Sequence, residues 1–208
     1  MQARVAAGRE NDQGRTITEQ ARRSQIVAAA IEVIAEDGYR NASFAAIARR
    51  AGLSSTGLIS YHFAGKSDLM AQVAQEVVAA IGQHMAARMA GAASAPDALE
   101  AYIRASVEFV ATRRRPMKAL LEIFLNGGFR YEPGTDLVVL SPVEDILLAG
   151  QRAGEFRAFD PRVMAAVIQR AIDGLPFLLE THPDLDLDSY ASELVTTFGL
   201  ATRPASRS

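Results

Sequence analysis

The chain has 208 residues, a formal net charge of -2 and no cysteine. Its length suits one sizeable core or two small domains, and the lack of cysteine excludes disulfides, thiolate metal sites and cysteine nucleophiles. No apolar run approaches the ~20 residues of a membrane span, and the amino terminus lacks the continuous apolar region of a secretion signal. We therefore expect a cytoplasmic protein without a membrane partner.

The charge is unevenly distributed along the chain. Residues 1–66 hold nine basic and six acidic side chains, whereas the remainder holds thirteen basic and eighteen acidic ones. A basic front on an acidic body favours a nucleic-acid-facing module joined to a second unit. A solvated surface can produce the same difference by chance, so the charge alone does not decide between these interpretations.

The front of the chain predicts a flexible arm followed by three helices. Residues 1–17 are polar and aperiodic, which is typical of a mobile arm. Apolar residues at helical spacing then predict a first helix of roughly twenty residues that ends at Gly38. Ser43 can cap a short second helix that ends at Gly52, and a third short helix follows. Two short helices joined by a tight glycine turn form a helix-turn-helix.

These three helices need a shared apolar core. Leu58 and Tyr61 lie three residues apart in the third helix, a spacing that predicts that both face the core. The expected core residues are Ile47, Ala48, Ala51, Leu53, Leu58 and Tyr61. Apolar residues from Leu69 to Met89 recur every fourth position and predict a helix too long for a three-helix domain to cover. We expect this helix to connect the front module to the rest of the chain.

Beyond Pro96 the pattern is helical throughout, so the predicted fold class is all-α. Several of the segments begin with proline, whose missing amide is harmless at a first helical position. The expected helices cover residues 97–112, 116–129, 142–150, 161–181 and 188–200. Residues 126–142 form the main irregular connection. Within it, "DLVVL" is a helix start, a loop or an edge strand.

The stretch "GLSSTGLISYHFAGKSDL", residues 52–69, carries the chemistry of the front module. A helix that enters the DNA major groove needs short side chains that let its backbone approach, and hydroxyl groups that reach base edges and phosphates. Residues of this kind are Ser54, Ser55, Thr56, Gly57 and Ser60. Tyr61 and His62 can bond phosphate oxygens, and Lys66 adds a cation at the start of the next helix. A purely structural role for Tyr61 and Phe63 stays open.

The front of the chain resembles the tetracycline-repressor (TetR) family of bacterial transcription regulators. The elements "AEDGYRNASF", "IARRAG", "LSSTGLISYHF" and "GKSDL" follow one another in the family's order over residues 18–70. The segment from Gly52 to Phe63 is one residue longer than the commonest family spacing, and Ser60 stands where an aromatic residue is frequent. This departure leaves the register of the base-contacting residues open by one position.

The resemblance implies a sequence-specific regulator, a repressor that a small-molecule effector releases from a palindromic operator in double-stranded DNA. It implies a homodimer of chains with a helix-turn-helix DNA-binding domain at residues 18–66 and a helical effector-binding and dimerisation domain at residues 67–202. A flexible arm at 1–17 and a flexible tail at 203–208 flank these domains. Ser43 and the backbone-holding Tyr61, His62 and Lys66 would contact phosphates, and Ser54, Ser55, Thr56, Gly57 and Ser60 would face the groove.

For the second domain, the resemblance implies a partly apolar effector pocket and a dimer interface. The candidate pocket residues are Met85, Met89, Tyr102, Phe109, Met117, Leu121, Phe124 and Phe177. The candidate dimer residues are Val163, Val167, Ala171, Gly174, Leu178, Leu194 and Phe198. For both sets, an ordinary place in the core of one chain remains an alternative.

Other chemistries find little support in the sequence. No nucleophile–base pair, carboxylate pair or phosphate loop can be assembled, so we expect no enzyme, no cofactor and no metal site. His62 has no second metal ligand at a useful spacing, and "HPDLDLD" at 182–188 is better explained as a loop that enters a helix. The run Arg113-Arg114-Arg115 indicates an exposed helix end more than an anion site.

Two alternative functions remain open. In the first, the protein binds DNA but its second domain responds to a protein partner instead of a small molecule. In the second, the helical body is a carrier or an enzyme, and the helix-turn-helix only packs against it. A catalytic constellation would distinguish the second alternative, and the sequence offers none.

Overall fold

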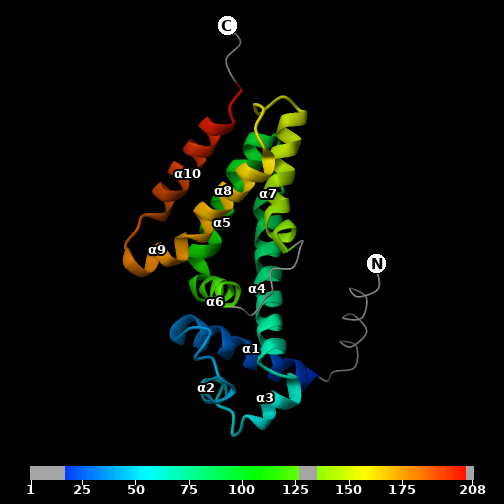
Figure 1. Cartoon of the computed structure of the whole chain (residues 1–208), viewed down its shortest axis with the longest axis vertical. Helices are drawn as coiled ribbons and strands as arrows, with labels where there is room; N and C mark the ends of the chain where they lie inside the picture. Colours follow the sequence, from blue (N-terminus) through cyan, green and yellow to red (C-terminus); the bar gives the residue numbers. More distant parts are fainter. Residues whose placement is uncertain (1–16, 127–134, 205–208) are drawn as a thin grey trace.

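The computed structural model describes residues 17–126 and 135–204, and ten helices form its regular structure there. Three of them gather at one end of the molecule (Figure 1): α1 (Ile17–Asp37), α2 (Phe44–Arg50) and α3 (Gly57–His62). From this group, which we call the head, α4 (Lys66–Met89) rises into the remaining helices. The all-α prediction is thus confirmed for the described residues, and none of their helices is long and apolar enough to cross a membrane.

The remaining six helices form a larger unit, which we call the body. They are α5 (Ala95–Thr112), α6 (Arg114–Leu125), α7 (Thr135–Arg152), α8 (Pro161–Asp173), α9 (Leu175–Thr181) and α10 (Leu187–Thr202). Two apolar clusters fill the body, one where α4, α5, α6, α9 and α10 meet and the other among α5, α7, α8 and α10. Both α5 and α10 contribute to the two clusters and so join them.

Caps and glycines set the ends of the head helices, as the sequence predicts. The Ala46 N–H donates to Ser43 Oγ (3.2 Å) at the start of α2. Gly52 adopts a left-handed conformation (φ +64°), and the next amide, that of Leu53, donates back to Ala48 O (2.9 Å). This arrangement closes the carbonyl end of α2 and turns the chain sharply toward α3.

A single apolar cluster holds the head together and reaches into the body. Its fully buried members include Ile26, Ile34, Ile47, Ile59, Leu69, Met70, Ala119 and Ile123. The last two belong to α6, so the head core contains side chains from the body. The head therefore does not close over its own core, and α6 completes it.

The predicted orientation of α3 is wrong. Leu58 and Tyr61 were expected in the core, but they are 37% and 73% exposed. Ile59 and Phe63, one turn apart, fill that place at 0% and 2% exposure. The buried residues are thus shifted by one position from Leu58 and by two from Tyr61, and Ile59 packs in one cluster with side chains of α1 and α4. Ile47, Ala48 and Ala51 are buried as predicted, and Leu53 packs against them.

Three body segments also differ from expectation. The helix predicted at 142–150 is α7, which starts at Thr135, so that "DLVVL" is helical and Pro142 lies inside the helix. The helix predicted at 161–181 is broken at Gly174 into α8 and α9. Pro176 explains the break, because it has no amide to donate to the preceding turn. The helix predicted at 116–129 is α6, which ends earlier, at Leu125.

The burial pattern of α3 predicts the effect of two neighbouring substitutions. Ile59→Ala removes a fully buried side chain and is expected to lower the free energy of unfolding by ~2–5 kcal/mol. Leu58→Ala, its matched control, is expected to cost less than ~1 kcal/mol because that side chain is partly exposed. Urea denaturation followed by circular dichroism measures both. Equal losses in the two variants would contradict the orientation described above.

Candidate nucleic-acid interface

The turn and α3 form the end of the head that lies farthest from the body (Figure 1). The side chains proposed to face a DNA groove are all exposed there: Ser54, Ser55, Thr56, Gly57 and Ser60. On the other side of α3, Ile59 and Phe63 are buried. The helix therefore shows a hydroxyl-rich face to solvent and an apolar face to the core, as a groove-reading helix requires.

The fold of this chain does not require glycine at position 57. A Cβ at this position would meet only Ser55 Oγ, at 3.4 Å, and its φ is not left-handed. The absent side chain instead lowers the profile of the first turn of α3. A low profile lets the backbone approach a duplex closely, at a cost to helix stability of ~1 kcal/mol relative to alanine.

Tyr61 and His62 lie at the carboxyl end of α3, against the first turn of α1. The Tyr61 hydroxyl donates to Glu19 Oε1 (3.2 Å), and its ring meets the His62 ring edge to face, with centroids 5.0 Å apart. Tyr61 is largely exposed, whereas His62 is half-buried. Tyr61 therefore contacts α1, and the His62 ring packs against the Tyr61 ring at the end of α3.

Lys66 makes a contact that the sequence does not reveal. Its ammonium donates to Tyr39 O (2.6 Å) and lies 4.5 Å from the centre of the Tyr39 ring. Partial burial lowers the pKa of this lysine. Lys66 thereby ties the connection between α1 and α2 to the first turn of α4. To bind a phosphate, as predicted from the sequence, the Lys66 ammonium would have to keep its bond to Tyr39 O at the same time or give it up.

Sequence reasoning missed Arg23, which organises the head. Its guanidinium donates to His62 O (2.9 Å) and Gln72 Oε1 (2.6 Å) and lies 4.3 Å from the centre of the Phe63 ring. One side chain of α1 thus holds the end of α3 and the second turn of α4. No local pattern marks such a residue, because its partners are about forty and fifty positions away.

A charged network links the head to the body. Arg50 on α2 binds Glu32 Oε2 (3.0 Å) and also Glu36 on α1, while Glu36 Oε1 accepts from Arg115 on α6 (3.2 Å). The hydrogen bond from Arg50 lowers the pKa of Glu36, and the same bonds raise the pKa of Arg50. Further along α6, the Glu122 carboxylate accepts from the Tyr39 amide (3.2 Å).

Seven of the eight predicted pocket residues are divided between the two apolar clusters of the body. Phe109, Met117, Leu121 and Phe124 belong to the first apolar cluster of the body, whereas Tyr102, Met85 and Met89 belong to the second. Phe177 is 40% exposed on α9. Two of the hollows on the described part of the surface measure about 340 and 370 Å³, the first beside α5 and α10 and the second between α1, α6 and α9. None of the eight residues lines either hollow.

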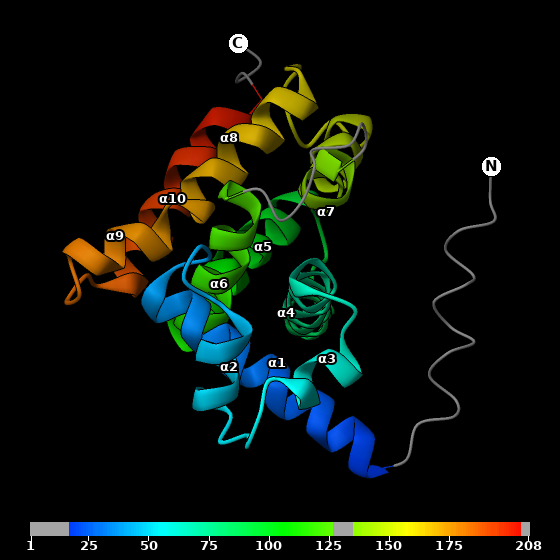
Figure 2. The same ribbon diagram turned by 60° about the horizontal axis from the view of Figure 1, so that its bottom comes forward.

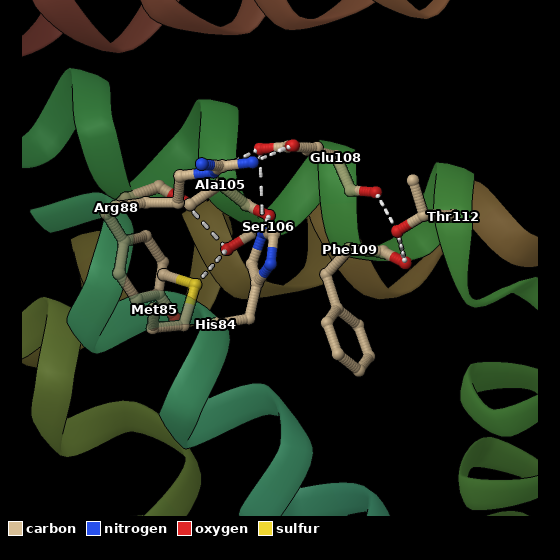
Figure 3. A network of polar contacts seen from close by, with 9 residues as sticks. His84, Met85, Arg88, Ala105, Ser106, Glu108, Phe109 and Thr112 are labelled. Carbon is tan, nitrogen blue, oxygen red and sulfur yellow. Dashed lines mark hydrogen bonds and ion pairs between the residues drawn. The ribbon is translucent and has the colours of Figure 1, made fainter.

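Polar groups also join the helices of the body. Between α4 and α5, His84 Nε2 lies 3.1 Å from Ala105 O, Arg88 Nε donates to Glu108 (2.8 Å), and Ser106 Oγ approaches Met85 Sδ at 3.8 Å (Figure 3). The bond from Arg88 lowers the pKa of Glu108.

A second polar chain connects α5 to α8. The Tyr102 hydroxyl donates to Gln169 (2.8 Å), and Gln169 donates to Asp173 (2.8 Å). Burial, aided by Asp173, raises the pKa of Tyr102 to about 12. Among the described residues, no group of His, Asp and Glu side chains is arranged to hold a metal ion.

The predicted dimer residues divide between surface and core. Val163 and Val167 on α8 are 60% and 53% exposed, and Gly174 is exposed as well. Ala171, Leu178 and Leu194 are half-buried, whereas Phe198 is buried inside the chain. An exposed apolar stripe therefore runs along α8, and Phe198 serves the intramolecular core.

Comparison with known proteins identifies the family. The family model described as bacterial regulatory proteins, tetR family, matches residues 26–73. The HTH-type transcriptional regulator BetI 1 of Chromohalobacter salexigens is 30% identical over 159 residues, which cover 76% of this chain and 75% of the relative. The chain belongs to the tetR family. It is thus a DNA-binding transcriptional regulator and not an enzyme.

Solved structures of tetR-family regulators share the fold. A regulatory protein of the family from Rhodococcus RHA1 has a TM-score of 0.75 at 22% identity, over 88% of this chain and 98% of that one. AibR, determined in complex with isovaleryl coenzyme A and operator DNA, has a TM-score of 0.73 at 17% identity, over 85% of this chain and 97% of that one. At these identities the likeness concerns the fold alone.

Substitutions of Ser43 separate capping from DNA contact in this tetR-family chain. Ser43→Ala removes the cap of α2 and is expected to lower the free energy of unfolding by ~1 kcal/mol. Ser43→Asp keeps an acceptor for the Ala46 amide, so stability is expected to be retained, but the new carboxylate repels phosphates. Thermal denaturation and fluorescence anisotropy with a random-sequence duplex measure the two effects. Wild-type DNA affinity in Ser43→Asp would exclude a phosphate beside this residue.

Proposed function

We propose that this protein is a homodimeric repressor that binds a palindromic operator through its head and is released when a small molecule binds its body. Residues 18–66, which include the helices of the head, form the DNA-binding domain, and residues 67–202 bind the effector and form the dimer. The arm and tail predicted at residues 1–17 and 203–208 lie, apart from Ile17, Arg203 and Pro204, outside the described residues. The protein acts in the cytoplasm, where its DNA target lies.

The observation that carries this proposal is the two-sided character of α3. Its exposed face presents small and hydroxyl-bearing side chains, while Ile59 and Phe63 fix the opposite face in the core. A rigidly held helix with a low polar face is the element that reads base edges in the major groove. Ser43, Tyr61, His62 and Lys66 then hold the phosphates on either side.

Release by an effector requires that the body can move the head. The long helix α4 belongs to both units, and α6 adds Ala119 and Ile123 to the head core. A molecule that binds between α4 and the middle helices would displace α4 and α6 together. The two heads of a dimer would then no longer match successive major grooves ~34 Å apart. The effector acts only as far as it prefers this non-binding conformation.

A partly apolar organic molecule fits the side chains available in the body. Met85, Met89 and Tyr102 lie together in the second apolar cluster, and methionine adapts readily to a ligand. AibR, which shares the fold, was determined with an acyl coenzyme A and operator DNA together. This precedent supports the binding of an organic molecule by a protein of this fold.

One observation favours the alternative, a body that responds to a protein partner. The predicted pocket residues are packed in two clusters or lie at the surface, and none lines a described hollow. The two mechanisms differ in what dissociates the complex with operator DNA. Release by a small molecule supports the effector mechanism, and release only by added protein supports the alternative.

The proposal is tested by selecting binding sites from a random-sequence duplex library with the full-length protein. A two-fold symmetric site is expected, with half-sites about 10 base pairs or a multiple apart. Ser55→Ala and Ser60→Ala are expected to alter the selected bases, whereas a phosphate-contact variant such as Ser43→Asp weakens all sites alike. The absence of any enriched, salt-sensitive sequence would refute the proposal.

Dimerisation through α8 is tested by placing a charge in the exposed stripe. Val167→Arg is expected to convert the dimer to a monomer and to weaken operator binding by ~100-fold or more, because the two half-sites are then bound independently. Val78→Arg on α4, where the valine is 45% exposed, is the matched control. Analytical ultracentrifugation gives the oligomeric state. A dimer that survives Val167→Arg would exclude this face.

A further inference from the structure

Three arginines of the head have side chains without an ion-pair partner in residues 17–126 and 135–204: Arg22, Arg40 and Arg49. The other cations of the head are engaged. Arg23 binds His62 O and Gln72, Arg50 binds two glutamates, and Lys66 binds Tyr39 O. A cation bound to a carboxylate or a backbone carbonyl must give up or share that partner to bind DNA, so the arginines without such a partner are the better candidates.

Among these three, Arg22 is the one that the described hydrogen bonds orient. Its Nη1 donates to Gln25 Oε1 (2.7 Å), and Gln25 Nε2 donates to Ala51 O (2.7 Å). Ala51 ends α2 and immediately precedes the left-handed Gly52. One side-chain amide thus links the guanidinium to the turn that leads into α3. In Figure 2, where the head faces the reader, this turn lies at its outer edge.

We propose that Arg22 contacts a phosphate of the DNA strand beside α3 and that Gln25 is the residue that positions it. The inference rests on the proposed placement of α3 in the major groove. An α-helix with side chains is ~10–12 Å wide and the groove is ~12 Å wide, so a phosphate strand lies close to each flank of the helix. A cation held next to the turn that opens α3 meets one of these strands.

The chemistry of the pair suits a phosphate. Only one of the five N–H groups of the guanidinium is used by Gln25, so the remaining edge can bind phosphate oxygens in the bidentate manner typical of arginine. The hydrogen bond to Gln25 fixes the side chain before DNA arrives, which reduces the entropy lost on binding. Gln25 is neutral and therefore orients Arg22 without cancelling its charge.

The experiment measures operator affinity of the full-length protein by fluorescence anisotropy over a series of KCl concentrations. The duplex is the site recovered by the selection described above. Arg22→Gln is expected to weaken binding ~10-fold or more. It is also expected to make the slope of log K against log salt shallower by ~0.9 for each lost phosphate contact, hence about 1.8 for a symmetric dimer.

Arg49→Gln is the matched control, because it removes the same charge from an exposed, unpaired arginine of the same domain. Its effect on the slope is expected to be smaller than that of Arg22→Gln. Equal changes in the two variants would mean that only the overall charge matters, and would overturn the assignment of Arg22.

Gln25→Leu tests the positioning role. If Gln25 acts through Arg22, the loss of affinity caused by Gln25→Leu is smaller in an Arg22→Gln background than in the wild type, as a double-mutant cycle reveals. An equal loss in both backgrounds would overturn the positioning role. If the wild-type protein selects no site, the proposed function itself fails. An operator-binding wild type with an unchanged salt slope in Arg22→Gln overturns this inference alone.

Discussion

The burial of Ile59 and Phe63 beneath α3 is the constraint on which the rest of the interface depends. A helix of six residues is far below the length of ~12–15 residues at which isolated helices become even marginally stable, so α3 exists because its apolar face is anchored. The Arg23 guanidinium adds to this anchoring, because it donates a hydrogen bond to His62 O at the end of the helix. Because the buried face of α3 stabilises the helix, its exposed face can consist of polar side chains that do not contribute to folding.

The same anchoring joins the head to the body. Ala119 and Ile123 of α6 are fully buried in the head cluster, and Glu122 and Arg115 of the same helix bind the end of α1 through Tyr39 and Glu36. Closely packed interfaces of this kind change by switching between discrete arrangements, since they cannot deform continuously. The head is therefore connected to the body by both α4 and α6. A displacement of the body that moves α4 without α6 would open a cavity in the core of the head.

The sequence predicts the helices well where strong local signals mark their ends. Ser43, Gly38 and Gly52 each act through the backbone of their own turn, so their effects can be read without knowledge of the fold. The orientation of α3 could not be predicted in this way. A helix of fewer than two turns has too few apolar residues to define a face, and an error of one position exchanged Ile59 for Leu58. The bonds of Arg23 to His62 and Gln72, and that of Gln25 to Ala51, could not be predicted for another reason. These partners are distant in sequence, and only the fold brings them together.

The uneven distribution of charge along the chain favours the approach of DNA to one end of the protein. The side chains proposed to face the groove are uncharged, so in the proposed complex most of the attraction to DNA comes from contacts with phosphates, as in other protein–DNA complexes. The protein as a whole carries a formal charge of -2, and the acidic excess lies beyond residue 66. Such a chain is attracted to a duplex at one end and repelled at the other. Within the head, ion pairs engage Arg50 and hydrogen bonds engage Arg23, so part of the positive charge of this unit already has partners inside the protein.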